Sequence, residues 1–136
     1  SVAIKEGFIG EDMFFYAGPG CLAKAELARE VLLERFKIVG LEAEEIRIDF
    51  IGVNALLGPM APKPKAEPNE VAVRVSARTK TRKEAEKVGR EVDGMAVSGL
   101  GATGKRVPHG ERVREVMGVW SLLVPRDAVN AEVHYF

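Results

Sequence analysis

The order of hydrophobic patterns along the chain constrains its fold more than any other feature. Two amphipathic helical segments each lie between segments whose apolar residues alternate, and a glycine-rich turn touches each helix. This order is β-α-β-β-α-β. A chain of 136 residues fits a single domain, residues 1–136, and is long enough to bury a core without disulfides.

Both helices are indicated by apolar residues that recur every three or four positions. The first spans residues 21–39, and Gly40 ends it. The second begins at the capping box of Thr81 and Glu84 and ends within residues 94–99. Their apolar faces consist of Leu22, Ala25, Ala28, Leu32 and Phe36 in the first helix, and Ala85, Val88, Val92 and Ala96 in the second.

Four segments have the composition of strands. Residues 13–17 form a short aromatic first strand, residues 45–51 and 71–78 alternate cleanly, and the apolar run 113–124 is typical of a central strand buried on both faces. Residues 131–136 are a candidate for an extra C-terminal edge strand. We therefore predict an α+β fold, a ferredoxin-like βαββαβ two-layer sandwich whose antiparallel sheet carries both helices on one face.

Two connections are unusual. Residues 52–69 contain four prolines and cannot form regular structure, so this Pro-rich loop is either a functional flap over the sheet or a spacer. Residues 99–110 form a glycine-rich loop that carries cationic side chains. Because the helices cover one sheet face, we expect the functional surface on the bare face or in the turns.

Composition excludes several functions. The 20 basic residues balance the 20 acidic ones, so no global field attracts the chain to nucleic acid or to an anionic membrane. Cys21 is the only cysteine, and no apolar run has the length of a membrane span. We expect a cytoplasmic protein without cofactor or metal. The absence of glutamine and the abundance of Lys, Arg and Glu favour a heat-adapted source.

The two glycine-rich turns are candidate anion sites. Gly18 and Gly20 lead a strand into a helix N-terminus, where free N–H groups can hold a phosphate or carboxylate, although glycine also simply permits a tight turn. In the second loop, backbone freedom is combined with cations and a histidine, at Gly99, Gly101, Gly104, Lys105, Arg106 and His109. The alternative there is a solvated crossover loop. Cys21 is either an activated thiol or, more commonly, a small buried residue.

The bare sheet face is predicted to carry an interaction face of Arg47, Asp49, Arg74 and Arg78. These residues lie at outward positions of the two alternating strands. They suit an anionic ligand, or they pair with one another and dock on another part of the protein, which we favour. RNA-binding sheets stack bases on aromatic side chains, and the outward positions of residues 71–78 have none, so we expect no nucleic-acid partner.

The chain also resembles the acyclic terpene utilisation family, the AtuA-like proteins. The matching pieces are YAGPG at 16–20, KA at 24–25, EVLLER at 30–35, IDFIGVN at 48–54, VRVSAR at 73–78, GREV at 89–92, the Gly99 loop, VREV at 113–116 and LVPR at 123–126. The resemblance implies a role in the breakdown of branched terpenoid acids and alcohols. It also implies that the chain is the C-terminal part of a larger module with an α/β portion in front.

Two hypotheses follow for the function. The first is a binding or assembly module that acts with the missing α/β portion or with a twin subunit. The alternative is part of an enzyme of branched terpenoid acid or acyl-CoA catabolism, whose glycine-rich loops hold a small anionic ligand. Whether the chain is an enzyme stays open at this point.

Overall fold

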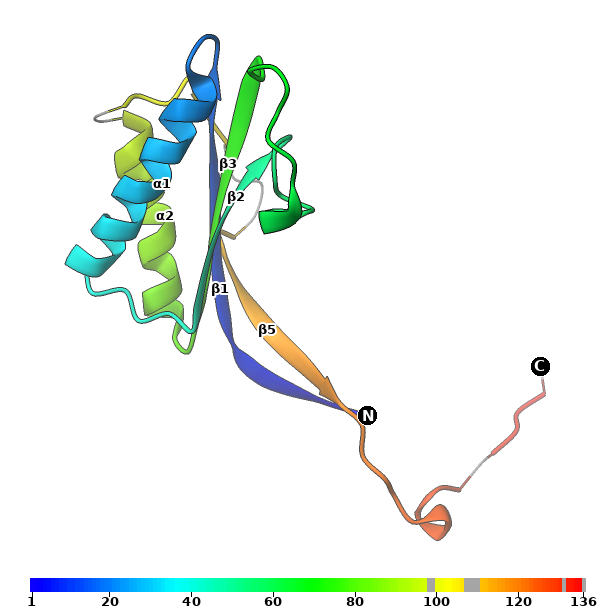
Figure 1. Ribbon diagram of the computed structural model, residues 1–136. Helices are drawn as coiled ribbons and strands as arrows, with labels where there is room; N and C mark the ends of the chain where they lie inside the picture. The colour runs from blue at the N-terminus through cyan, green and yellow to red at the C-terminus, as the bar shows by residue number, and fades with distance from the viewer. Residues whose placement is uncertain (98–99, 107–110, 131, 136) are drawn as a thin grey trace.

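The computed structural model describes residues 1–97, 100–106, 111–130 and 132–135. In this part of the chain, two helices cover one face of a five-stranded antiparallel sheet (Figure 1). The elements are β1 (Val2–Ala17), α1 (Cys21–Ile38), β2 (Glu45–Ile51), β3 (Glu70–Thr79), α2 (Arg82–Val97), β4 (Gly104–Lys105) and β5 (Val113–Trp120), with 3-10 turns at Gly58–Met60 and Arg126–Ala128. The predicted α+β class is thus confirmed.

The sheet departs from the predicted four-stranded ferredoxin-like arrangement because it has a fifth strand. Its strands run β2-β3-β1-β4, and β5 pairs with β1 outside this path. Two strands, β4 and β5, pair with the edge of β1 that lies opposite β3. β4 pairs with Phe14 and Phe15, and β5 pairs with β1 residues 2–10. Among the described residues of the glycine-rich loop, Gly104–Lys105 form a strand of two residues, and β5 pairs with the other part of this edge.

β1 is far longer than the predicted strand 13–17. It has 16 residues because both of its edges are paired, by β3 from Phe8 to Ala17 and by β5 from Val2 to Gly10. Glycines and charged residues interrupt the apolar alternation of its first half, so the pattern alone does not reveal a strand there. Residues 2–7 of β1 and 116–120 of β5 extend beyond the helix layer as a two-stranded ribbon, here called the arm (Figure 1).

The prediction of a central, doubly buried strand at 113–124 was wrong. β5 ends at Trp120, pairs only with β1 in the described chain, and has one buried residue, Val113. Its apolar residues face solvent because no further strand or helix among the described residues covers the arm. The possible C-terminal edge strand is not formed by residues 132–135, and residues 131 and 136 lie outside the described part.

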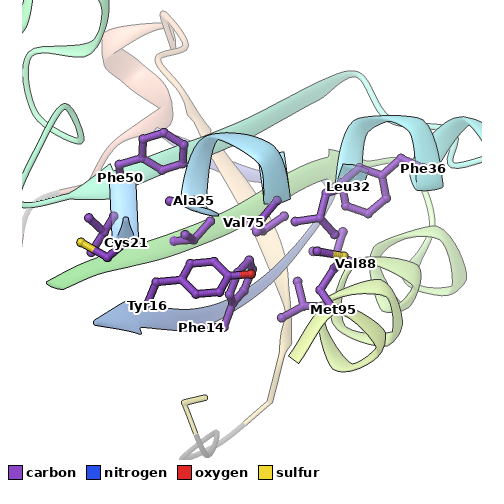
Figure 2. Close-up of a cluster of buried hydrophobic side chains, with 14 of the residues drawn as sticks. Phe14, Tyr16, Cys21, Ala25, Leu32, Phe36, Phe50, Val75, Val88 and Met95 are labelled. Atoms are coloured by element: carbon purple, nitrogen blue, oxygen red, sulfur yellow. The ribbon is translucent and has the colours of Figure 1, made fainter. Parts of the chain in front are cut away.

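The core lies between the helices and the sheet. Phe14 and Tyr16 of β1 meet edge to face, with ring centroids 5.6 Å apart. Figure 2 shows them beneath Leu32 of α1 and close to Val88 of α2. The buried faces of both helices agree with the predicted stripes, except that Met95 is buried in place of Ala96 and Leu22 is only partly covered.

α2 packs unusually close to β1. A Cβ atom at Gly10 would overlap the carbonyl oxygen of Ala85, so only glycine allows the helix backbone to approach the strand at this point. α2 is in turn held at its start by the predicted cap, in which the N–H of Glu84 donates to the Thr81 hydroxyl at 3.3 Å. The helix is therefore fixed over the middle of β1.

The Pro-rich loop, residues 52–69, folds back against the start of α1. The N–H of Gly18 donates to the carbonyl of Asn69 at 2.8 Å, and the thiol of Cys21 donates to the carbonyl of Pro68 at 3.0 Å. The loop is therefore not a spacer. Its first part reaches the bare face, where the Ala55 carbonyl accepts a hydrogen bond from Arg47 Nη2 at 3.0 Å, and its last part lies beside α1. It forms one wall of a cleft beside α1.

Candidate functional site

The first glycine-rich turn already holds a carboxylate of the chain itself. Gly18 and Gly20 adopt positive φ angles of 79° and 76°, which glycine takes without strain. The N–H of Gly20 donates to Oε1 of Glu67 at 2.5 Å, so the Pro-rich loop supplies an anion to the N-terminus of α1. Sequence reasoning did not single out Glu67. Binding of an external anion at this turn stays a prediction.

Cys21 is a buried residue at the first position of α1. Its side chain is fully covered, and its thiol proton is directed to the Pro68 carbonyl. These contacts match the predicted role of a small core residue and tie α1 to the Pro-rich loop.

A cleft of about 580 Å³ separates α1 from the Pro-rich loop. Its wall combines apolar residues such as Leu22 and Phe50 with the cations Arg29, Lys63 and Lys65. The Arg29 guanidinium lies over the Phe50 ring at 5.7 Å, a cation–π contact. This cleft was not predicted from the sequence, because it depends on the path of a proline-rich segment without periodicity.

The second glycine-rich loop runs back along the end of β1. The N–H of Thr103 donates to the Phe15 carbonyl at 2.8 Å, and the Thr103 hydroxyl accepts the N–H of Ala17 at 3.0 Å. The loop therefore lies beside the strand end that leads into the first turn. Gly99 and His109 lie outside the described residues, whereas Gly101 has a positive φ of 52°.

Lys105 of this loop belongs to an ion-pair network under the helices. Asp12 is fully buried, with Arg112 Nε 3.3 Å and Lys105 Nζ 3.7 Å from its Oδ2. Both cations also pair with Asp93 of α2, Arg112 at 2.7 Å. Two carboxylates thus meet two cations. Because its charge is neutralised there, Lys105 fixes the loop onto β1 and α2.

Arg106 points to the opposite, bare face of the sheet, where it joins a group we call the Glu11 cluster. Glu11 is bonded by Arg74, with Nη2 2.6 Å and Nε 2.9 Å from Oε2. Arg106 Nη1 lies 3.7 Å from Oε1, and Arg114 Nη2 lies 3.6 Å from Oε2. The Glu11 cluster consists of Glu11, Arg74, Arg106 and Arg114. Three guanidinium groups therefore share one carboxylate.

The remaining residues of the predicted interaction face are also paired on the bare side. Arg47 Nε lies 2.8 Å from Asp49 Oδ1, and this hydrogen bond raises the pKa of Arg47. Arg78 is held between Glu6 at 3.3 Å and Glu44 at 3.2 Å. Sequence reasoning predicted the arginines but missed their acidic partners on β1. The acidic residues within the segment of β1 could have indicated these ion pairs, because a charged side chain at a half-buried position needs a partner of opposite charge.

Neither a membrane-spanning helix nor a metal-binding cluster is found among the described residues. No helix there is both long and apolar enough to cross a bilayer. Within the same residues, no three His, Cys, Asp or Glu side chains are grouped so that they could hold a metal ion.

Fold and charges together define a small two-layer α+β domain with one sheet face open and occupied by paired arginines. Residues 1–135 match the model of a family described as acyclic terpene utilisation family protein AtuA. The chain therefore belongs to this family, and the resemblance in the sequence is confirmed. Comparison with curated proteins gave no match.

Proposed function

We propose that this domain is an assembly module of the AtuA family and that a second copy of the chain covers its arm. The observation that carries the proposal is the exposed apolar surface of the arm and of the segment after it. The exposed residues are Val2, Ile4, Met117, Val119, Trp120, Leu122, Leu123 and Val124. A two-stranded ribbon is at best marginally stable alone in water, so such a surface favours a partner.

The charges of the arm are already satisfied within the chain. Lys5 pairs with Glu115 at 2.6 Å, and the indole N–H of Trp120 donates to Glu6 at 3.3 Å. A partner would therefore contact the arm mainly through its exposed apolar side chains. A standard-size interface buries about 800 Å² of each partner. Because the outer edge of β5 is unpaired in the described chain, two copies can also join antiparallel at this strand.

The predicted interaction face takes a secondary place in this proposal. Arg47, Arg74 and Arg78 each have a carboxylate partner in the same chain, so their net attraction for a partner is small. They lie along the sheet beyond the arm and would form the polar border of the contact. A preceding α/β portion of a larger protein is the other occupant that the sequence hypothesis named.

Membership of the family supports a role in the breakdown of branched terpenoid compounds. We place this role in the cytoplasm of a heat-adapted source, on the composition alone. The alternative, an enzyme part whose glycine-rich loops hold an anion, receives less support. Glu67 lies at Gly20 and Asp93 lies at Lys105, so carboxylates of the chain already use these donors.

Sedimentation equilibrium of the purified chain tests the assembly role. We expect a dimer, and we expect Val119→Ser combined with Trp120→Ser to shift it to monomer. Leu56→Ser is the matched control, because Leu56 is fully exposed in the Pro-rich loop and distant from the arm in sequence. A wild-type chain that stays monomeric at all concentrations would overturn the proposal. So would a dimer that the double variant leaves intact.

A further inference from the structure

We propose that the bare sheet face binds an amphipathic anion, a short apolar chain that ends in a carboxylate or phosphate. Its head group would meet Arg106 and Arg114, and its chain would lie in a hollow beside Phe15. The site is at the end of the sheet away from the arm, so this inference goes beyond the assembly role and does not depend on it.

The charge balance of the Glu11 cluster favours an anion. Arg74 donates two N–H groups to the Glu11 carboxylate. The guanidinium nitrogens of Arg106 and Arg114 lie 3.7 and 3.6 Å from the Glu11 carboxylate oxygens, beyond ordinary hydrogen-bond length. Arg106 Nε is buried and has no hydrogen-bond partner within the described chain. Within the Glu11 cluster three cations face one carboxylate, whereas farther along the face Arg47 pairs with Asp49 and Arg78 lies between Glu6 and Glu44.

Guanidinium groups suit this head group. Arginine presents a planar fork of N–H donors that matches the two oxygens of a carboxylate or phosphate. Arg106 and Arg114 come from two separate segments, one beside β4 and the other in β5, and both point to Glu11. Glu11 itself is a model of the proposed ligand, because its carboxylate is the group the three arginines already surround.

The chain site is a hollow of about 610 Å³ at the end of the same face. Its wall includes Phe15 of β1, Ile51 of β2 and Ala72 of β3, with Thr103 and Gly104 at its side. The volume lies within the range of small-molecule pockets, about 300–1,000 Å³. Apart from Glu70, Tyr16 and Thr103, the residues of the wall are apolar or glycine, so the hollow suits hydrocarbon.

The register of the sheet connects the two parts. Phe15 lies opposite Ala72, and Met13, two residues earlier on β1, lies opposite Arg74. The N–H of Arg106 donates to the Met13 carbonyl at 3.1 Å, so Arg106 belongs to the same row as Arg74. Adjacent rows on one face are about 7 Å apart, which a chain of several carbons can span.

Isothermal titration calorimetry with octanoate and octyl phosphate tests the site, with octanol and inorganic phosphate as matched controls that each lack one half of the ligand. We expect the amphipathic anions to bind more tightly than either control, and the tighter of the two identifies the head group. Arg106→Gln and Arg114→Gln should each weaken binding about tenfold. Ala72→Leu should also weaken it by filling the hollow.

Glu11→Gln gives a test of opposite sign. Removing the competing carboxylate should strengthen binding of the same anions severalfold, a gain that damage to the fold would not produce. Arg90→Gln is the control for loss of a guanidinium, because Arg90 lies on α2 and pairs with Glu86. The inference is overturned if octanol binds as well as octanoate and octyl phosphate, if neither anion binds, or if the arginine variants bind like Arg90→Gln.

Discussion

Glu11 and Asp12 are neighbours on β1, yet their carboxylates lie on opposite faces of the sheet and hold separate groups of cations. Their partners Lys105 and Arg106 are also consecutive residues and also lie on opposite faces. Lys105 pairs with Asp12 under the helices, and Arg106 pairs with Glu11 on the bare face. Alternation of side chains along both segments explains the arrangement. The two-residue strand β4 is thereby held to β1 from both faces.

Replacing Asp12 should destabilise the fold strongly. Asp12→Asn removes a fully buried charge and leaves Arg112 and Lys105 with Asp93 alone. Breaking a buried ion pair from one side costs about 3 kcal/mol, and we expect a loss of this size in the free energy of unfolding measured with urea. Glu86→Gln, which breaks an exposed i,i+4 pair with Arg90, should change it by at most about 0.5 kcal/mol. Equal effects of the two changes would contradict the role of Asp12.

Two glycine-to-alanine changes should have opposite effects. At Gly10 the new methyl group would meet the Ala85 carbonyl and force α2 away from β1, at a cost of about 3 kcal/mol. At Gly94, which lies within α2 itself, a Cβ meets no atom within 4 Å, and alanine should stabilise the helix by about 0.5–1 kcal/mol. Thermal unfolding of both variants measures the difference. A tolerated Gly10→Ala would show that the close approach is not required.

Stability should fall in acid partly through Glu84. Its pKa is lowered in the folded protein, chiefly by the hydrogen bond from Lys87 and then by the N–H of Glu42. A lowered folded pKa stabilises the protein above the pKa of the unfolded chain, and this contribution is lost as pH falls through the folded pKa. Glu84→Gln should therefore be less stable than wild type at neutral pH and should show a shallower decline in acid.

The measurement for Glu84 is urea unfolding at a series of pH values from about 7 to about 3, across the usual range of carboxyl titration. Glu30→Gln is the control, since Glu30 makes no ion pair or hydrogen bond in the described chain apart from helix backbone bonds. If Glu30→Gln flattens the acid decline as much as Glu84→Gln, the contact with Lys87 is not its cause.

Cys21 should report on the Pro-rich loop. The buried thiol should react slowly with a disulfide reagent such as DTNB in the native protein. Glu67→Gln weakens the charge-assisted bond to Gly20, which holds the loop over Cys21, and should raise the rate of labelling about tenfold or more. Glu70→Gln is a nearby control outside this contact. An unchanged rate in Glu67→Gln would mean that the carboxylate does not hold the loop in place.

Local patterns predicted the regular elements well where each element buries one face. The limits of β2 agree with the predicted 45–51, and the Thr81 cap lies at the start of α2. The patterns failed for β1 and β5 because neither strand follows a simple burial rule. Asp12 of β1 is buried because Lys105 and Arg112 pair with it, and β5 is apolar although the described chain leaves it exposed.

In the candidate sites, too, local features were predicted from the sequence and contacts between distant segments were not. Glycines at 18 and 20 were correctly expected to lead a strand into α1, since their backbone needs are local. The Glu67 contact and the Glu11 cluster were not foreseen, because each joins segments more than 40 residues apart in the chain. The anion role predicted for Arg106 remains a prediction, now with a specific set of neighbours.

Family, class of fold, and the limits of α1, β2 and β3 to within one residue were thus available from the sequence, since periodicity and local turns record what each segment buries. The tertiary structure alone decided how the last edge of the sheet is divided and which charges meet. It did so because strand pairing and ion pairs between distant segments depend on where the whole chain places them. No single stretch of residues contains that information.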